Sequence, residues 1–148
     1  MSRYEALREH FARTGMEVEE HAADGWVATD GFGANGAWLL VGQAYDDRGA
    51  VAVYSVLGAH VPEERRDAMD ELLTRLNHGI VLGSFEMDYE DGEVRFKCSA
   101  PAPDAPTPES LGPLTAVALS VTDHYLPALQ AVLDDGDPAA VAEHYRAQ

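Results

Sequence analysis

Residues 81–98, VLGSFEMDYEDGEVRFKC, contain the clearest strand pattern in the chain and decide its fold. On the first limb, apolar residues alternate with acidic and hydroxyl side chains. The apolar residues of this limb are Val81, Phe85, Met87 and Tyr89. The returning limb alternates in the same way, with these apolar residues: Val94, Phe96 and Cys98. Asp91-Gly92 lies between the limbs and favours a two-residue turn. The stretch therefore predicts an antiparallel hairpin with one buried and one wet face.

A second pair of strand-like segments precedes this hairpin. Residues 37–45 and 50–57 are mostly apolar, and Asp46-Asp47-Arg48-Gly49 between them is typical of a turn. Between the two hairpins, Pro62 and the glutamates after it predict the start of a helix that ends at residues 77–79. Its apolar residues recur at helical spacing: Met69, Leu72, Leu73 and Leu76.

The beginning of the chain predicts a helix and weaker strands. Ser2 and Glu5 form a capping-box pattern at a helix start. Residues 16–22 alternate weakly, as an edge strand would, and residues 26–29 predict another short strand. Residues 32–36 have the composition of a turn.

The C-terminal part predicts helices. Residues 99–108 contain four prolines and predict an extended loop. Residues 111–129 have an apolar stripe at helical spacing, although Pro127 should kink this helix. Residues 138–145 predict a short last helix.

This order of elements predicts an α+β fold, in which an antiparallel sheet of about five strands has helices packed against it. The order is helix, three strands, helix, two strands and helix. Because the 148 residues are 46% hydrophobic and 24% charged, we expect one domain over residues 1–148.

Charge excludes several classes of partner. The chain has 10 basic and 26 acidic residues, a formal net charge of −16. So few cations disfavour nucleic acid and anionic membrane surfaces, which are bound through Lys and Arg. The acid excess either serves solubility alone or favours basic protein partners. A single cysteine and an N-terminus without an apolar secretory signal predict the cytoplasm.

Several short motifs, in this order, resemble the bacterial YbjN family. They are Leu76-Asn77, Gly83-Ser84-Phe85-Glu86-Met87-Asp88, Asp91-Gly92-Glu93-Val94 with Phe96, and Thr122-Asp123-His124-Tyr125-Leu126-Pro127-Ala128-Leu129. The hairpin with Trp38 and the helix start Val61-Pro62-Glu63-Glu64 also fit, so that the resemblance covers about residues 36–135. The resemblance implies a sensory transduction regulator with a fold similar to type III secretion chaperones. It also implies a homodimer that binds proteins, and it offers no catalytic residues.

The residues themselves point to no catalytic or metal site. No two of the six histidines stand three or four positions apart, so a helical metal motif is missing. Cys98 is expected in the core. Asp88, Glu90 and Asp91 before Gly92 are similar to a calcium loop, but the spacing does not fit. We therefore expect no metal, no cofactor and no enzyme activity.

Aromatic side chains are the candidates for recognition. Trp26, Phe32 and Tyr54 are predicted as protein-binding residues, whereas Trp38 is expected in the core. The sequence thus predicts a non-catalytic, chaperone-like regulatory module that holds a segment of a partner protein. A dedicated chaperone of a secreted effector is the first alternative. A small enzyme using scattered residues such as His60, His78 and Asp88 is the second.

Overall fold

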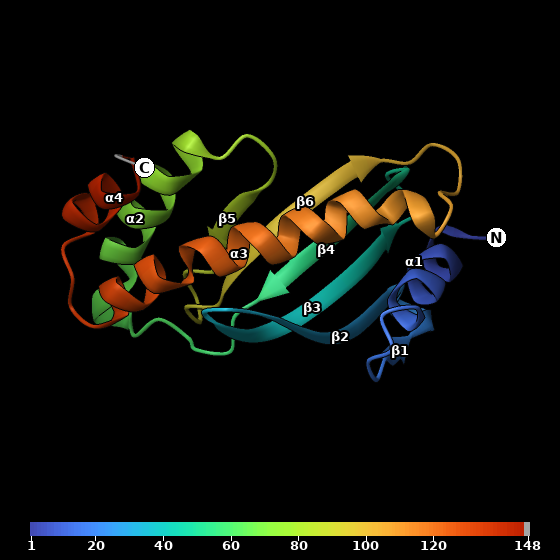
Figure 1. Cartoon of the computed structure of the whole chain (residues 1–148), viewed down its shortest axis with the longest axis horizontal. Coiled ribbons are helices and arrows are strands. Elements are labelled where there is room, and N and C mark those ends of the chain that lie inside the picture. The colour runs from blue at the N-terminus through green and yellow to red at the C-terminus, as the bar shows by residue number, and fades with distance from the viewer. Residues whose placement is uncertain (147–148) are drawn as a thin grey trace.

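The computed structural model describes residues 1–146, in which one sheet is packed against helices (Figure 1). The helices and strands in chain order are α1 (Arg3–Ala12), β1 (Glu19–His21), β2 (Trp26–Gly33), β3 (Gly36–Tyr45), β4 (Ala50–Val56), α2 (Arg66–Gly79), β5 (Ser84–Met87), β6 (Val94–Pro101), α3 (Gly112–Leu133) and α4 (Pro138–Arg146). Three single-turn 3-10 helices connect them: Ala22–Asp24, Glu63–Arg65 and Glu109–Leu111.

The sheet over residues 1–146 has six strands in the order β1-β2-β3-β4-β6-β5, and every neighbouring pair is antiparallel. The predicted α+β fold is confirmed, with one strand more than expected. The sixth strand arises because both weak N-terminal segments are strands. The pattern at residues 16–22 is a strand only over Glu19–His21, whereas the segment predicted at 26–29 extends to Gly33.

The predicted two-residue turn between β5 and β6 is wrong. β5 ends at Met87, and residues 88–93 form a wider loop that is closed by a hydrogen bond from the Gly92 N–H to the Asp88 carbonyl. The loop packs on Val61, whose N–H donates to the Gly92 carbonyl over 2.9 Å. A Cβ at Gly92 would lie 2.2 Å from the Val61 carbonyl oxygen, so the contact requires glycine.

The helix predicted from Pro62 begins later than expected. Glu63–Arg65 form a 3-10 turn, and α2 starts at Arg66. The Arg65 side chain donates to the carbonyls of Val132 and Gly136, which joins this turn to the end of α3. All four residues of the predicted apolar stripe are buried: Met69, Leu72, Leu73 and Leu76.

Helices α1 and α3 lie on the same face of the sheet. Antiparallel Cα partners and alternate residues of a strand share a face. Gly42 on β3 faces α1, because a Cβ there would lie 2.9 Å from Leu7, and Gly36 on the same strand would meet Leu126 of α3. Figure 1 shows α3 crossing the strands, with α1 near one end of the sheet and α2 with α4 at the other.

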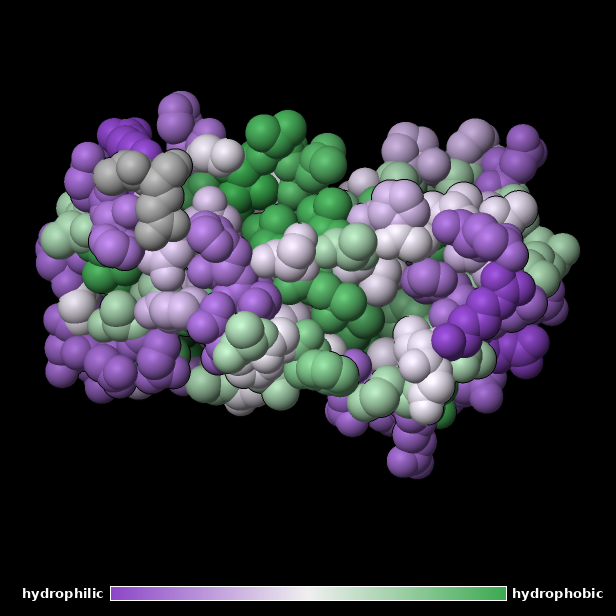
Figure 2. Space-filling view, viewed as in Figure 1, coloured by the Kyte–Doolittle hydropathy of each residue, from purple (hydrophilic) through white to green (hydrophobic). Residues whose placement is uncertain are grey.

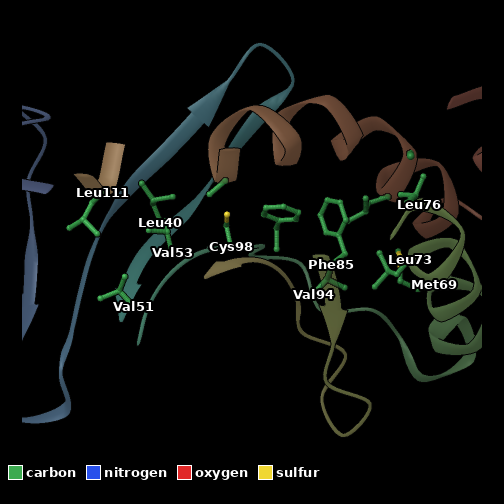
Figure 3. Close-up of a cluster of buried hydrophobic side chains, with 14 of the residues drawn as sticks. Leu40, Val51, Val53, Met69, Leu73, Leu76, Phe85, Val94, Cys98 and Leu111 are labelled. Atoms are coloured by element: carbon green, nitrogen blue, oxygen red, sulfur yellow. The ribbon is translucent and has the colours of Figure 1, made fainter. Parts of the chain in front are cut away.

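The core lies between this face and the helices. Figure 3 shows this core extending along the sheet: Leu40 and Val53 lie toward Leu111, whereas Phe85 and Val94 lie next to Met69 of α2. Cys98 is 5% exposed, so the expected core position is confirmed, and burial raises the pKa of its thiol. A thiol with a raised pKa forms little of the reactive thiolate.

Asn77 protects the outer edge of the sheet at β5. Its side-chain oxygen accepts from the Phe85 N–H over 2.8 Å, and its amide nitrogen donates to the Phe85 carbonyl over 2.9 Å. The side chain thus replaces a neighbouring strand. Exposed edges invite pairing with other chains, and this contact blocks such pairing at Phe85.

We expect Asn77→Ala to lower the free energy of unfolding by about 1–3 kcal/mol, because both half-buried backbone groups of Phe85 lose their partner. Urea unfolding measures this. Thr74→Ala on the exposed side of the same helix is the control and should change little. Equal effects of the two substitutions would contradict the proposed role of Asn77.

Candidate protein-binding surface

Among residues 1–146, no helix lies over one face of the sheet, and we call it the open face. It is formed by the strand residues that alternate with those facing α1 and α3. Its members on the central strands are Trp26, Ala28, Asp30 and Phe32 on β2, Ala37, Leu39, Val41, Gln43 and Tyr45 on β3, and Ala50, Ala52, Tyr54 and Val56 on β4. Arg95 and Lys97 of β6 continue it, as does Glu86 of β5.

The three predicted binding residues all lie on the open face but differ in exposure. Phe32 is 62% exposed. Trp26 is half-buried and stacks on His21, with ring centroids 3.7 Å apart. Tyr54 is 5% exposed, and its hydroxyl lies 2.5 Å from that of Tyr45. Phe32 is therefore the one of the three that offers a large apolar surface to a partner.

Tyr54 instead organises the polar part of the open face. The Arg95 guanidinium lies 4.4 Å from the centre of the Tyr54 ring, which is a cation–π distance. Burial raises the pKa of the Tyr54 hydroxyl, and so does its hydrogen bond with Tyr45. Glu86 pairs with Arg95 and lies 3.3 Å from the Lys97 amine, so the two cations share one acidic partner.

An exposed apolar cluster that single-residue reasoning missed surrounds Phe32. We call it the Phe32 patch, and its members are Phe32, Ala37, Leu39 and Val56. Leu39 is 41% exposed, whereas its neighbours Trp38 and Leu40 are buried. The expected core position of Trp38 is confirmed, and strand alternation then places Leu39 on the open face. This alternation along β3 was the sequence signal that could have revealed the Phe32 patch.

The β2 edge beside the Phe32 patch is unpaired over half its length. β1 pairs only with Trp26–Ala28, so that residues 30–33 have β3 as their one strand neighbour. A strand with such an edge can accept an extended segment through backbone hydrogen bonds. Asp30 is exposed on this edge and gives it negative charge.

A second apolar surface lies on the helical side. We call it the Val81 patch, and its members are Ile80, Val81 and Leu82 of the α2–β5 loop with Val117 and Val121 of α3. Val81 is 93% exposed and Leu82 is 61% exposed. Figure 2 shows hydrophobic residues gathered over this loop and the adjacent part of α3. The groove between them contains no acidic or basic side chain apart from His124.

A cavity of about 370 Å³ opens at the end of the sheet, between the β2–β3 turn, residues 57–61 and the second half of α3. We call it the end cavity. Its lining is mainly aliphatic, and Val61, Met69, Val94 and Leu129 form the buried part of it.

Pro127 shapes one wall of the end cavity. Proline has no N–H, so it leaves the carbonyl four residues earlier, that of Asp123, without its helical partner. Asn35 in the β2–β3 turn donates its side-chain amide to that carbonyl over 2.9 Å, and its backbone N–H donates to the Asp123 carboxylate over 2.8 Å. α3 continues through Pro127 to Leu133 and is tied there to the hairpin.

The scattered residues of the enzyme hypothesis do not converge on a described cavity. His78 lines a groove with Tyr125 and Tyr145, whereas His60 bonds to the Asp91 carbonyl in the β5–β6 loop. Asp88 accepts from the Glu90 N–H in the same loop. Within residues 1–146, no group of three or more His, Cys, Asp or Glu side chains could hold a metal ion.

The geometry defines a class: an antiparallel sheet with helices on one face, with exposed apolar surfaces and, within residues 1–146, without a group of side chains that could hold a metal ion. The chain belongs to the YbjN family, described as "Putative bacterial sensory transduction regulator", whose model matches residues 3–131. The resemblance of the motifs to that family is thereby confirmed. A search of the curated proteins gave no match. In residues 1–146, no helix has the length and apolar character to cross a membrane.

We expect Asn35→Ala to lower the free energy of unfolding by about 1 kcal/mol, because the Asp123 carbonyl loses its donor. In the background of Pro127→Ala the same substitution should cost clearly less, since the new N–H can bond that carbonyl within the helix. Urea unfolding of the four variants of this cycle measures the difference. An equal cost in both backgrounds would contradict the link between Asn35 and Pro127.

Proposed function

We propose that this chain is a non-catalytic regulatory protein that holds an extended segment of a partner protein at the Phe32 patch. The observation that carries the proposal is the exposure of Phe32 and Leu39, which are diagonal neighbours on β2 and β3, on a sheet face that no helix of residues 1–146 covers. Buried aromatic anchors dominate binding energy at protein interfaces, and an exposed one is available here.

The unpaired edge of β2 supports an extended partner segment. Residues 30–33 can bond to its backbone, while its alternate side chains would lie on the Phe32 patch. Backbone bonds give affinity with little sequence preference, so that the patch would select apolar side chains.

Charge favours a basic partner. The chain carries a net charge of −16, and Asp30 is exposed at the edge itself. Lys or Arg beside the apolar residues of the partner would be attracted over a distance of about 10 Å at 0.1 M salt. Basic segments would therefore associate faster than acidic ones.

We place this activity in the cytoplasm, since the lone cysteine is buried and unpaired.

We further propose a homodimer formed through the Val81 patch. Two copies that each carry a charge of −16 repel each other, so they approach best where acidic side chains are missing. The patch places a projecting Val81 beside a groove of about 420 Å³. A two-fold contact needs such self-complementarity, because each copy supplies both the projection and the groove.

Photo-crosslinking in cells of the native bacterium tests the partner site. We expect benzoylphenylalanine in place of Phe32 to crosslink a specific protein, and the substitution Leu39→Ser in the same chain to reduce the yield about tenfold. The control places the crosslinker at Tyr89, an aromatic residue that is 48% exposed on the acidic loop. The same pattern of products from positions 32 and 89, or no product from position 32, would contradict the proposal.

Light scattering after size-exclusion chromatography tests the dimer. We expect a mass twice that of the 16.0 kDa chain, and a shift to the monomer mass in Val81→Asp, because the charge would be buried in the contact. Since Val81 is 93% exposed, the fold should survive this substitution. Phe32→Asp is the matched control and should remain dimeric. A monomeric parent chain, or a dimeric Val81→Asp variant, contradicts the proposal.

A further inference from the structure

We propose that the end cavity binds a small, uncharged and largely apolar molecule. The cavity shares only Ala37 with the Phe32 patch and no residue with the Val81 patch, and the inference does not depend on either partner surface. It rests on the lining, the size and the charge of the cavity.

Aliphatic groups form most of the lining. The walls and the buried end are formed by larger apolar residues: Leu57, Val61, Met69, Val94, Leu126, Pro127, Leu129 and Leu133. The remaining apolar lining residues are small: Gly36, Ala37, Gly58 and Ala59. Met69 and Val61 are at most 1% exposed, so the cavity reaches the core of the protein. A bound apolar group would therefore leave water and contact carbon on several sides.

The size fits a small molecule. The volume of about 370 Å³ lies in the range of roughly 300–1,000 Å³ that is typical of ligand sites. Apolar cavities of less than half this size, about 150 Å³, bind benzene in other proteins. The end cavity therefore has room for a ring system or a medium-length alkyl chain.

The lining excludes a charged ligand. It contains no acidic, basic or histidine side chain, and its polar side chains are the neutral amides of Asn35 and Gln130. Both are exposed, so they lie where the cavity meets solvent. A carboxylate inside would lose its hydration without gaining a cation, which is costly. An alcohol could reach an amide at the mouth with its hydroxyl group.

Gly58 provides a way to fill the cavity without disturbing the fold. It lines the cavity, its φ lies outside the left-handed region, and a Cβ there would meet no atom within 4 Å. A leucine at this position would extend into the open volume. Gly112 at the start of α3 also has an ordinary φ, −54°, and open space before its Cβ, but it does not line the cavity.

Titration with N-phenylnaphthylamine, a neutral apolar fluorophore, tests the site on the full chain. We expect saturable binding of one molecule per chain, displaced by decanol but not by decanoate, which has the same chain length and a negative charge. Gly58→Leu should raise the Kd at least about tenfold, and Gly112→Leu should leave it unchanged. Ala59→Leu, at the exposed side of the lining, is the second filling variant in case Gly58→Leu unfolds.

Three results would overturn the inference. The first is fluorescence that does not saturate in the parent chain. The second is unchanged affinity in folded Gly58→Leu and Ala59→Leu, which would place the probe elsewhere. The third is displacement by decanoate as strong as that by decanol, which would contradict the uncharged class of ligand. Thermal unfolding of each variant shows whether it is folded.

Discussion

The packing of α3 across one face of the sheet is the contact on which the rest of the structure depends. Ser55 of β4 donates to the carbonyl of Ala118 in the first half of the helix, and Asn35 binds Asp123 further along it. Two glycines at the hairpin allow the close approach. A Cβ at Gly33 would lie 2.3 Å from Asp123, and one at Gly36 would lie 2.6 Å from Leu126. Because α3 packs so closely on the β2–β3 hairpin, the hairpin and the helix form one packed unit.

One-sided packing determines where binding surfaces can occur. Because α1 and α3 lie on the same face, the opposite face has no helix over it in the part of the chain that the structure describes. Near β6 that face is polar, since Arg95 lies over Tyr54 and pairs with Glu86. Near the β2–β3 turn it is apolar and exposed at Phe32. The exposed apolar part of the open face therefore lies at the end near the β2–β3 turn.

Sequence patterns predicted the elements well where the period was local and strong. The stripe of α2 and the alternation of β6 depend on burial of one face, so the sequence must follow the period. The sequence patterns did not reveal contacts between segments that lie far apart in the chain. The wider β5–β6 loop depends on Val61, which lies 31 residues before Gly92, and no local rule contains that contact. For the same reason Tyr54 could be placed on a strand but not assigned its neighbours Tyr45 and Arg95. The end cavity likewise joins five separate parts of the chain: residues 35–37, 57–61, Met69, Val94 and residues 126–133.

The motif around Pro127, which carries part of the resemblance to the family, has structural roles in this fold. The proline frees the Asp123 carbonyl, and that carbonyl and carboxylate then hold Asn35. Leu126 packs at Gly36, and Leu129 lines the end cavity. Each of these roles is structural, because the motif joins the β2–β3 turn to α3 and shapes the wall of the cavity. The same joint lies next to the Phe32 patch, since Ala37 lines the cavity and is the Cα partner of Phe32.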